Sequence, residues 1–174
     1  MKCLVVYSSV TGNTRSVAEA IHAVLPHGTA IAPVYKAPDP DEFDFLALGF
    51  WVRRAMPDPR MIRYMQRVRG KNVGWFGTLA AWPDSDHAAK VRAHANSLLS
   101  GNKVAGGFLC QGRLASKRFN AAMNRGKYDT THPLTEERKT RLIEAGKHPN
   151  EDDFIAARLN FEAFLLSAIF ENNV

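Results

Sequence analysis

Short apolar runs alternate along this chain with stretches of helical periodicity, and this alternation constrains the fold more than any other feature of the sequence. In the intervening stretches, apolar residues recur at the three- and four-residue spacing of one helix face. Such alternation is typical of βαβ units around a parallel sheet, so the sequence predicts an α/β fold with five strands. The five runs lie at residues 2–7, 29–35, 43–50, 72–78 and 103–110.

The length of the chain, 174 residues, is close to that of one compact domain, and we expect residues 1–174 to form a single domain. The longest apolar runs are far shorter than the ~20 residues of a membrane-spanning helix, so we expect no membrane span. The first residues lack the cleavage site of a signal peptide. Cys3 and Cys110 lie inside apolar runs without metal-ligand spacing. We therefore expect a cytoplasmic protein with reduced, buried thiols and no metal site.

Basic residues are concentrated in two parts of the chain, whose formal net charge is +6. Residues 51–70 contain six arginines and one aspartate, and residues 101–149 contain ten lysines and arginines against four acids. Such clustering is compatible with a nucleic acid, an acidic protein or an anionic ligand as partner, and equally with a solvated basic face. Residues 113–127 fit no nucleic-acid-binding motif, so we expect no nucleic-acid partner.

The fifth apolar run is followed by a long polar and basic stretch at residues 111–148, which contains two His-Pro pairs. The stretch is too long for a plain connection, so the sequence predicts a basic insertion, with a helix at residues 135–145. Whether this insertion is functional or only a surface element stays open. A last helix, beginning near residue 150, carries an apolar stripe that can cover one face of the sheet.

The loop between the first strand and the first helix carries the clearest chemical signal. At a helix N-terminus, unpaired N–H groups and the helix dipole attract an anion. The loop adds hydroxyl groups, an amide and a glycine that permits a left-handed turn, but it has neither G-x-x-x-x-G-K-[ST] nor G-x-G-x-x-G. The sequence therefore predicts that this loop binds a terminal phosphate. The alternative, a turn that only caps the helix, would explain any one of these residues but not all of them together. The predicted phosphate-binding residues are Ser9, Val10, Thr11, Gly12, Asn13 and Thr14.

These six residues resemble the FMN-phosphate loop of the flavodoxin family, which reads T/S-x-T-G-N-T. The five-strand alternation extends the resemblance over residues 1–111 and the last helix, whereas residues 111–148 depart from the family pattern. The resemblance implies a doubly wound five-stranded parallel sheet of order 2-1-3-4-5. It also implies that FMN binds at the carboxyl ends of the strands, where the winding direction switches.

The resemblance further implies that the loops after the third and fourth strands flank the flavin ring, often with an aromatic side chain from each. An indole just beyond a buried strand can stack on a planar ring, although each tryptophan could instead pack its own loop onto the domain. Arginine at positions 53 and 54 would favour the anionic reduced flavin and raise its potential, unless both side chains point to solvent. The predicted ring contacts are Trp51, Val52, Arg53, Thr78, Leu79 and Trp82.

The favoured function is that of an FMN-binding electron carrier, which shuttles electrons between a reductase and an acceptor protein. Its redox partner is expected to bind the basic protein through an acidic docking surface. The alternative is an FMN-dependent oxidoreductase acting on a quinone, a porphyrinogen or another small substrate, with residues 111–148 forming its pocket. A flavin-free interaction module on the same fold is a third possibility. No catalytic acid, base or nucleophile is evident in the sequence.

Overall fold

A parallel sheet with strand order β2-β1-β3-β5-β6 forms the centre of the structure, a computed structural model that describes residues 1–124 and 133–171. Counted along the parallel strands alone, this is the order 2-1-3-4-5, so the predicted fold class is confirmed. A two-residue strand, β4, pairs antiparallel with the end of β3 and was not expected from the sequence. The strands are β1 (Cys3–Tyr7), β2 (Ala30–Pro33), β3 (Phe45–Arg53), β4 (Met56–Pro57), β5 (Asn72–Leu79) and β6 (Lys103–Gln111).

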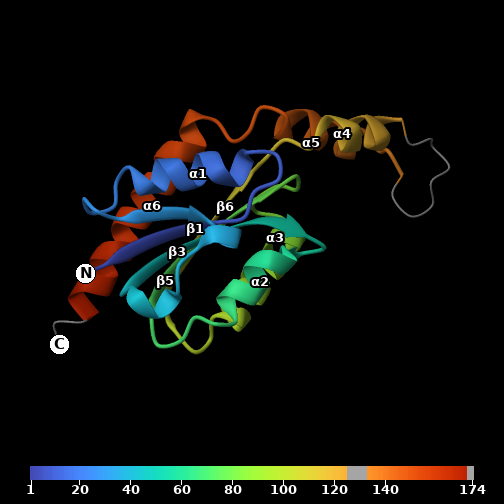
Figure 1. The fold of residues 1–174 in the computed structure, drawn as a ribbon. Helices are drawn as coiled ribbons and strands as arrows, with labels where there is room; N and C mark the ends of the chain where they lie inside the picture. The colour runs from blue at the N-terminus through green and yellow to red at the C-terminus, as the bar shows by residue number, and fades with distance from the viewer. Residues whose placement is uncertain (125–132, 172–174) are drawn as a thin grey trace.

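Helices cover both faces of the sheet (Figure 1). Helices α1 (Asn13–His22) and α6 (Glu151–Glu171) lie on one face, and α2 (Pro59–Met65) and α3 (Asp86–Leu98) lie on the other. Two short 3₁₀ turns, η1 (Val34–Lys36) and η2 (Pro40–Glu42), connect β2 to β3. This arrangement leaves the carboxyl ends of the strands uncovered by the helices that pack on the faces, which is where doubly wound folds place their ligands.

The two faces of the sheet bury separate apolar clusters. Phe45, Phe76 and Phe161 belong to the cluster under α1 and α6, and Phe50 and Trp75 belong to the cluster under α2 and α3. Full burial of such side chains contributes roughly 1.5–3 kcal/mol each. A Cβ at residue 107 would lie 2.1 Å from two Trp75 ring atoms, so only glycine at that position lets the indole lie against β6.

The described part of the predicted basic insertion, residues 111–124 and 133–148, contains the helices α4 (Ser116–Met123) and α5 (Glu136–Ala145), which lie beyond one end of the sheet (Figure 1). The predicted helix at residues 135–145 is therefore confirmed, with the Thr135 hydroxyl accepting the Arg138 N–H as its N-cap. The first His-Pro pair includes His132, which lies outside the described residues. In the second, His148 forms a 2.6 Å hydrogen bond through Nδ1 to Asp153 Oδ2 at the start of α6.

No helix within residues 1–124 and 133–171 is both long enough and apolar enough to cross a membrane. Over the same residues, histidine, cysteine, aspartate and glutamate side chains form no group of three that could hold a metal ion.

Candidate functional site

The β1–α1 loop, residues 8–12, turns sharply at the carboxyl end of β1. The Ser8 N–H donates to the Gly49 carbonyl of β3 at 2.8 Å, and the Gly12 N–H donates to Ser9 Oγ at 3.1 Å. Gly12 is left-handed, with φ of +94°, a conformation that costs residues with a side chain about 1–2 kcal/mol. The glycine therefore allows the loop to bend directly into α1.

The N-terminus of α1 has no side-chain cap and no acidic residue in its first turn. By contrast, Asp58 and Ser85 accept N–H groups at the starts of α2 and α3. The first N–H groups of a helix have no partner within the helix, and the helix dipole makes that end positive. The start of α1 is therefore left able to bind an anion.

A pocket of about 260 Å³, the β1–α1 pocket, lies beside this loop. Two guanidinium groups line it, Arg15 from α1 and Arg60 from α2, and Arg15 also pairs with Glu19 at 2.8 Å. Hydroxyl groups, positive charge and backbone N–H groups together fit a phosphate monoester. The lining residues are Tyr7, Ser8, Ser9, Gly12, Arg15, Pro33, Val34, Tyr35 and Arg60.

Two of the predicted phosphate-binding side chains, those of Asn13 and Thr14, do not line this pocket but form hydrogen bonds elsewhere that hold the loop in place. The buried Asn13 donates through Nδ2 to the Arg113 carbonyl at 2.8 Å, and the Arg113 N–H donates to the His148 carbonyl at 3.0 Å. Thr14 Oγ1 lies 2.8 Å from Thr78 Oγ1 at the end of β5. Val10 is 74% exposed, and Thr11 is partly buried. These contacts tie α1 to β5 and to the start of the basic insertion.

Several buried polar atoms near the carboxyl edge of the sheet have no hydrogen-bond partner among residues 1–124 and 133–171. They include Asn13 Oδ1, Gln111 Nε2 at the end of β6 and Asp58 Oδ2 just before α2. Buried polar groups in proteins are nearly always paired, so unpaired ones at one edge fit a site that receives a polar ligand. Together with the uncapped α1, these atoms show that the residues present fit a phosphorylated, hydroxyl-rich cofactor.

The predicted ring contacts from β3 lie in the strand, and not in a loop after it. Val52 and Arg53 pair with Pro57 and Met56 of β4, because the chain reverses at Arg54 and Ala55. Both turn residues have positive φ, 53° and 61°, the geometry of a tight hairpin turn that usually contains glycine or asparagine. The turn contains neither glycine nor asparagine, so the sequence does not predict this hairpin. His94 of α3 forms a 2.8 Å hydrogen bond between Nδ1 and the Ala55 carbonyl.

The other predicted ring contacts are divided between β5 and the loop after it. Thr78 and Leu79 are buried at the end of β5, where Thr78 lies in register with the partly buried Trp51 of β3. Trp82 lies in the following loop and lines a pocket of about 540 Å³, the tryptophan pocket. Neither tryptophan lines the β1–α1 pocket. The tryptophan pocket is lined by Trp82, Pro83, Asp84, Ser85, Ala89 and Arg92.

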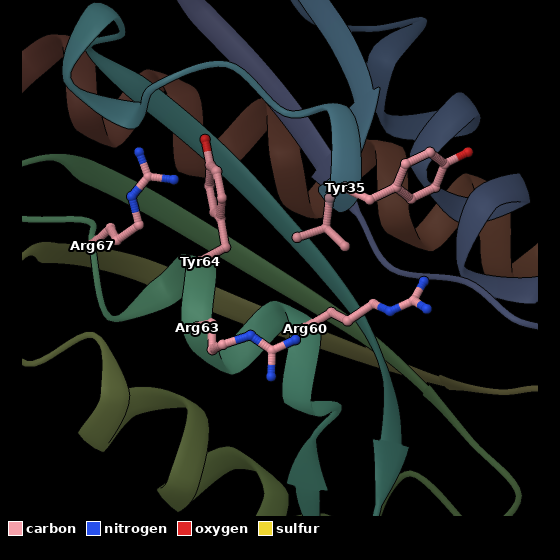
Figure 2. Close-up of a pocket in the computed structure, with 6 residues that line it drawn as sticks. Tyr35, Arg60, Arg63, Tyr64 and Arg67 are labelled. Carbon is pink, nitrogen blue, oxygen red and sulfur yellow. The ribbon is translucent and has the colours of Figure 1, made fainter.

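A third pocket of about 630 Å³, the arginine pocket, adjoins the β1–α1 pocket and shares Val34, Tyr35 and Arg60 with it (Figure 2). Its remaining lining residues are Arg63, Tyr64 and Arg67. The Tyr64 hydroxyl donates to the Pro38 carbonyl at 2.9 Å, and burial raises the pKa of this phenol to about 12. The cluster of arginines was visible in the sequence, but its position opposite η1 was not.

Neither cysteine is arranged as a nucleophile. Cys3 and Cys110 are buried free thiols, and burial raises the pKa of both. A thiol whose pKa is raised stays protonated at neutral pH, and the protonated form is a poor nucleophile.

Comparisons with known proteins agree with this geometry. The family model described as flavodoxin domain matches residues 4–162. The flavodoxin-like domain-containing protein BilS of Clostridioides difficile (strain CD3) is 26% identical over 173 residues, covering 97% of this chain and 98% of that protein. Oxidised Flavodoxin 2 from Bacillus cereus is similar in structure, with a TM-score of 0.56, 18% identity, and coverage of 96% and 99%. A flavoprotein from Lactobacillus acidophilus NCFM, crystallised with FMN, has a TM-score of 0.50, 17% identity, and coverage of 62% and 92%.

Proposed function

Because this chain belongs to the flavodoxin domain family, we propose that it binds FMN with the phosphate in the β1–α1 pocket. The observation that carries the proposal is the uncapped N-terminus of α1, which follows a left-handed Gly12 beside a pocket lined by two arginines. The Ser8 and Ser9 hydroxyls and the backbone N–H groups of residues 10, 11, 13 and 14 would hold the phosphate. The FMN complex of the similar Lactobacillus flavoprotein supports this choice of cofactor.

The flavin ring is assigned to the ends of β3 and β5, with Trp51, Val52, Arg53, Thr78, Leu79 and Trp82 as its contacts. Support comes from the register of the sheet, which places Trp51 directly opposite Thr78. Thr78 in turn contacts Thr14 at the start of α1, so the proposed ring and phosphate sites share one edge of the sheet. FMN, when bound, supplies reversible acceptance of electrons, and the residues of the chain orient it and set its electrostatic environment.

We infer that the protein is an electron carrier in the cytoplasm that exchanges electrons with an acidic partner protein. Five exposed arginines, Arg53, Arg54, Arg60, Arg63 and Arg67, lie between the end of β3 and the turn after α2. Charges of one sign on a surface steer an oppositely charged partner and accelerate its association at low ionic strength. Such steering weakens with added salt, because the Debye length shortens.

The alternative is an FMN-dependent oxidoreductase acting on a quinone, a porphyrinogen or another small substrate. The observation that favours it is the tryptophan pocket, whose volume of about 540 Å³ is large enough for a small organic molecule. Trp82 in that pocket is one of the proposed ring contacts, so a substrate bound there would lie beside the flavin.

Rapid mixing of the reduced, FMN-loaded protein with ferric cytochrome b5, an acidic haem protein, distinguishes the two functions. A carrier reoxidises once, with a second-order rate that falls at least tenfold between about 20 and 300 mM salt. In a parallel assay, the carrier shows no sustained turnover of menadione with NADPH. Sustained turnover of menadione, together with a salt-independent reaction with cytochrome b5, would support the enzyme and contradict the carrier.

A further inference from the structure

We infer that the arginine pocket is the docking site for an acidic segment of the partner protein, an inference that rests on the proposed carrier function. Arg60 and Arg63 extend from α2 along one side of the pocket, and Arg67 follows in the turn after the helix (Figure 2). Tyr35 from η1 lies across from them. The pocket thus joins two segments that are some 25 residues apart in the sequence.

The positive charge of this pocket is only partly neutralised within the described part of the chain. Arg67 pairs with Asp39 at 3.0 Å, whereas the guanidinium groups of Arg60 and Arg63 make no ion pair or hydrogen bond with other described residues. Asp58, the nearest acid along the chain, is 1% exposed and accepts the first N–H groups of α2. Two exposed guanidinium groups are therefore available for carboxylates of another molecule.

The residue types in the pocket favour a protein segment over a small anion. Tyrosine and arginine are the side chains that most often supply binding energy at protein interfaces. Tyr35 is 68% exposed, and Tyr64 is held firmly by its hydroxyl bond to Pro38. The three arginines follow one another along α2 and the turn after it, whereas the polar groups of a small-molecule site converge on an enclosed ligand. A segment with several carboxylates and an apolar side chain matches this row of arginines beside Tyr35.

The location of the pocket suits a carrier. It shares Val34, Tyr35 and Arg60 with the β1–α1 pocket, so a segment bound there would lie next to the proposed phosphate site. Docking at this place would bring a partner against α2, beside the proposed cofactor site.

Binding of a fluorescein-labelled peptide, Glu-Glu-Leu-Glu repeated three times, tests the inference by fluorescence anisotropy at about 20 mM salt. The test variant is Arg63→Glu with Arg67→Glu, two positions outside the β1–α1 pocket. The matched control is Lys117→Glu with Arg118→Glu, exposed on α4 and distant from α2 (Figure 1). Both double variants change the net charge equally, so they separate the effect of the pocket from that of overall charge.

We expect the test variant to bind the peptide at least tenfold more weakly than the unmodified protein, and the control to bind it within about threefold. Equal weakening in both double variants would overturn the inference, because overall charge would then explain the binding. Tighter binding of ATP than of peptide, lost in the test variant, would overturn it in favour of a small polyanion. Arg63→Gln with Arg67→Gln repeats the comparison without charge reversal, in case the glutamates impair folding.

An FMN titration of the same variants keeps this inference separate from the proposed function. Both double variants should bind FMN as the unmodified protein does, since neither changes a residue of the β1–α1 pocket. Absence of FMN binding in the unmodified protein would contradict the proposed function. The peptide comparison would still decide whether this pocket binds an acidic segment.

Discussion

The buried contact between the Thr14 and Thr78 hydroxyls offers a quantitative test of how the β1–α1 loop is held. The two oxygens are 2.8 Å apart, and the residues are 1% and 4% exposed. The variants Thr14→Val and Thr78→Val remove one hydroxyl each while they nearly preserve the shape of the side chain. Each single variant leaves the other hydroxyl buried without this partner.

The expected cost follows from that geometry. A buried hydroxyl without a partner costs about 1–3 kcal/mol, whereas removing both members of a pair can be nearly neutral. We therefore expect each single variant to lower the free energy of unfolding by about 1–3 kcal/mol. The double variant should lose at least about 1 kcal/mol less than the sum of the two single variants.

Urea unfolding of the flavin-free protein and the three variants, analysed as a double-mutant cycle, measures this coupling. Losses that add within about 0.5 kcal/mol would refute the contact, because unconnected sites are additive within that margin. The Thr14→Val variant should also bind FMN with nearly unchanged affinity, since the Thr14 side chain does not line the β1–α1 pocket.

Two further predictions concern charge and ionisation. Replacing Arg53 and Arg54 by alanine should lower the reduction potential of bound FMN by tens of millivolts, because the anionic reduced form loses positive neighbours. Dye-coupled potentiometry measures this potential, and an unchanged value would show that both arginine side chains point to solvent, away from the flavin. The thiol of Cys110 is 1% exposed, and burial raises its pKa above its usual value of about 9. The unfolded chain then loses this proton first as pH rises, so the thiol should reduce stability above about pH 9 by up to about 1.4 kcal/mol per pH unit. Urea unfolding at pH 8 to 10.5 should show a shallower decline for Cys110→Ala, and parallel curves would contradict this assignment.

The parts of the fold that follow from local pattern were predictable from the sequence. Buried strands and helix stripes have different hydrophobic periods, and the loop at residues 8–14 combines glycine with hydroxyl and amide groups at a helix start. The hairpin at Arg54 and Ala55 was not predictable, because its turn lacks the glycine or asparagine that usually marks one. As a result, Trp51, Val52 and Arg53 were expected in a loop and lie in β3.

Contacts between distant parts of the chain were also beyond prediction from a single sequence. The Asn13 side chain bonds to the Arg113 carbonyl, 100 residues away, so an amide expected to bind phosphate also anchors the basic insertion. The arginines of α2 formed a visible cluster in the sequence. Their position across from Tyr35 depends on how β2, η1 and α2 pack against one another. The residue pattern within each segment does not determine that packing.

An FMN titration of the flavin-free protein, followed by flavin fluorescence, tests the central proposal most directly. We predict saturable binding of one FMN per chain, weakened at least tenfold in Ser8→Ala with Ser9→Ala, whose hydroxyls line the β1–α1 pocket, and unchanged in Lys117→Glu with Arg118→Glu. Circular dichroism of each variant checks that the fold is retained. Absence of binding at tens of micromolar FMN, or equal affinity in all three proteins, would contradict the assignment of the β1–α1 loop as the phosphate site.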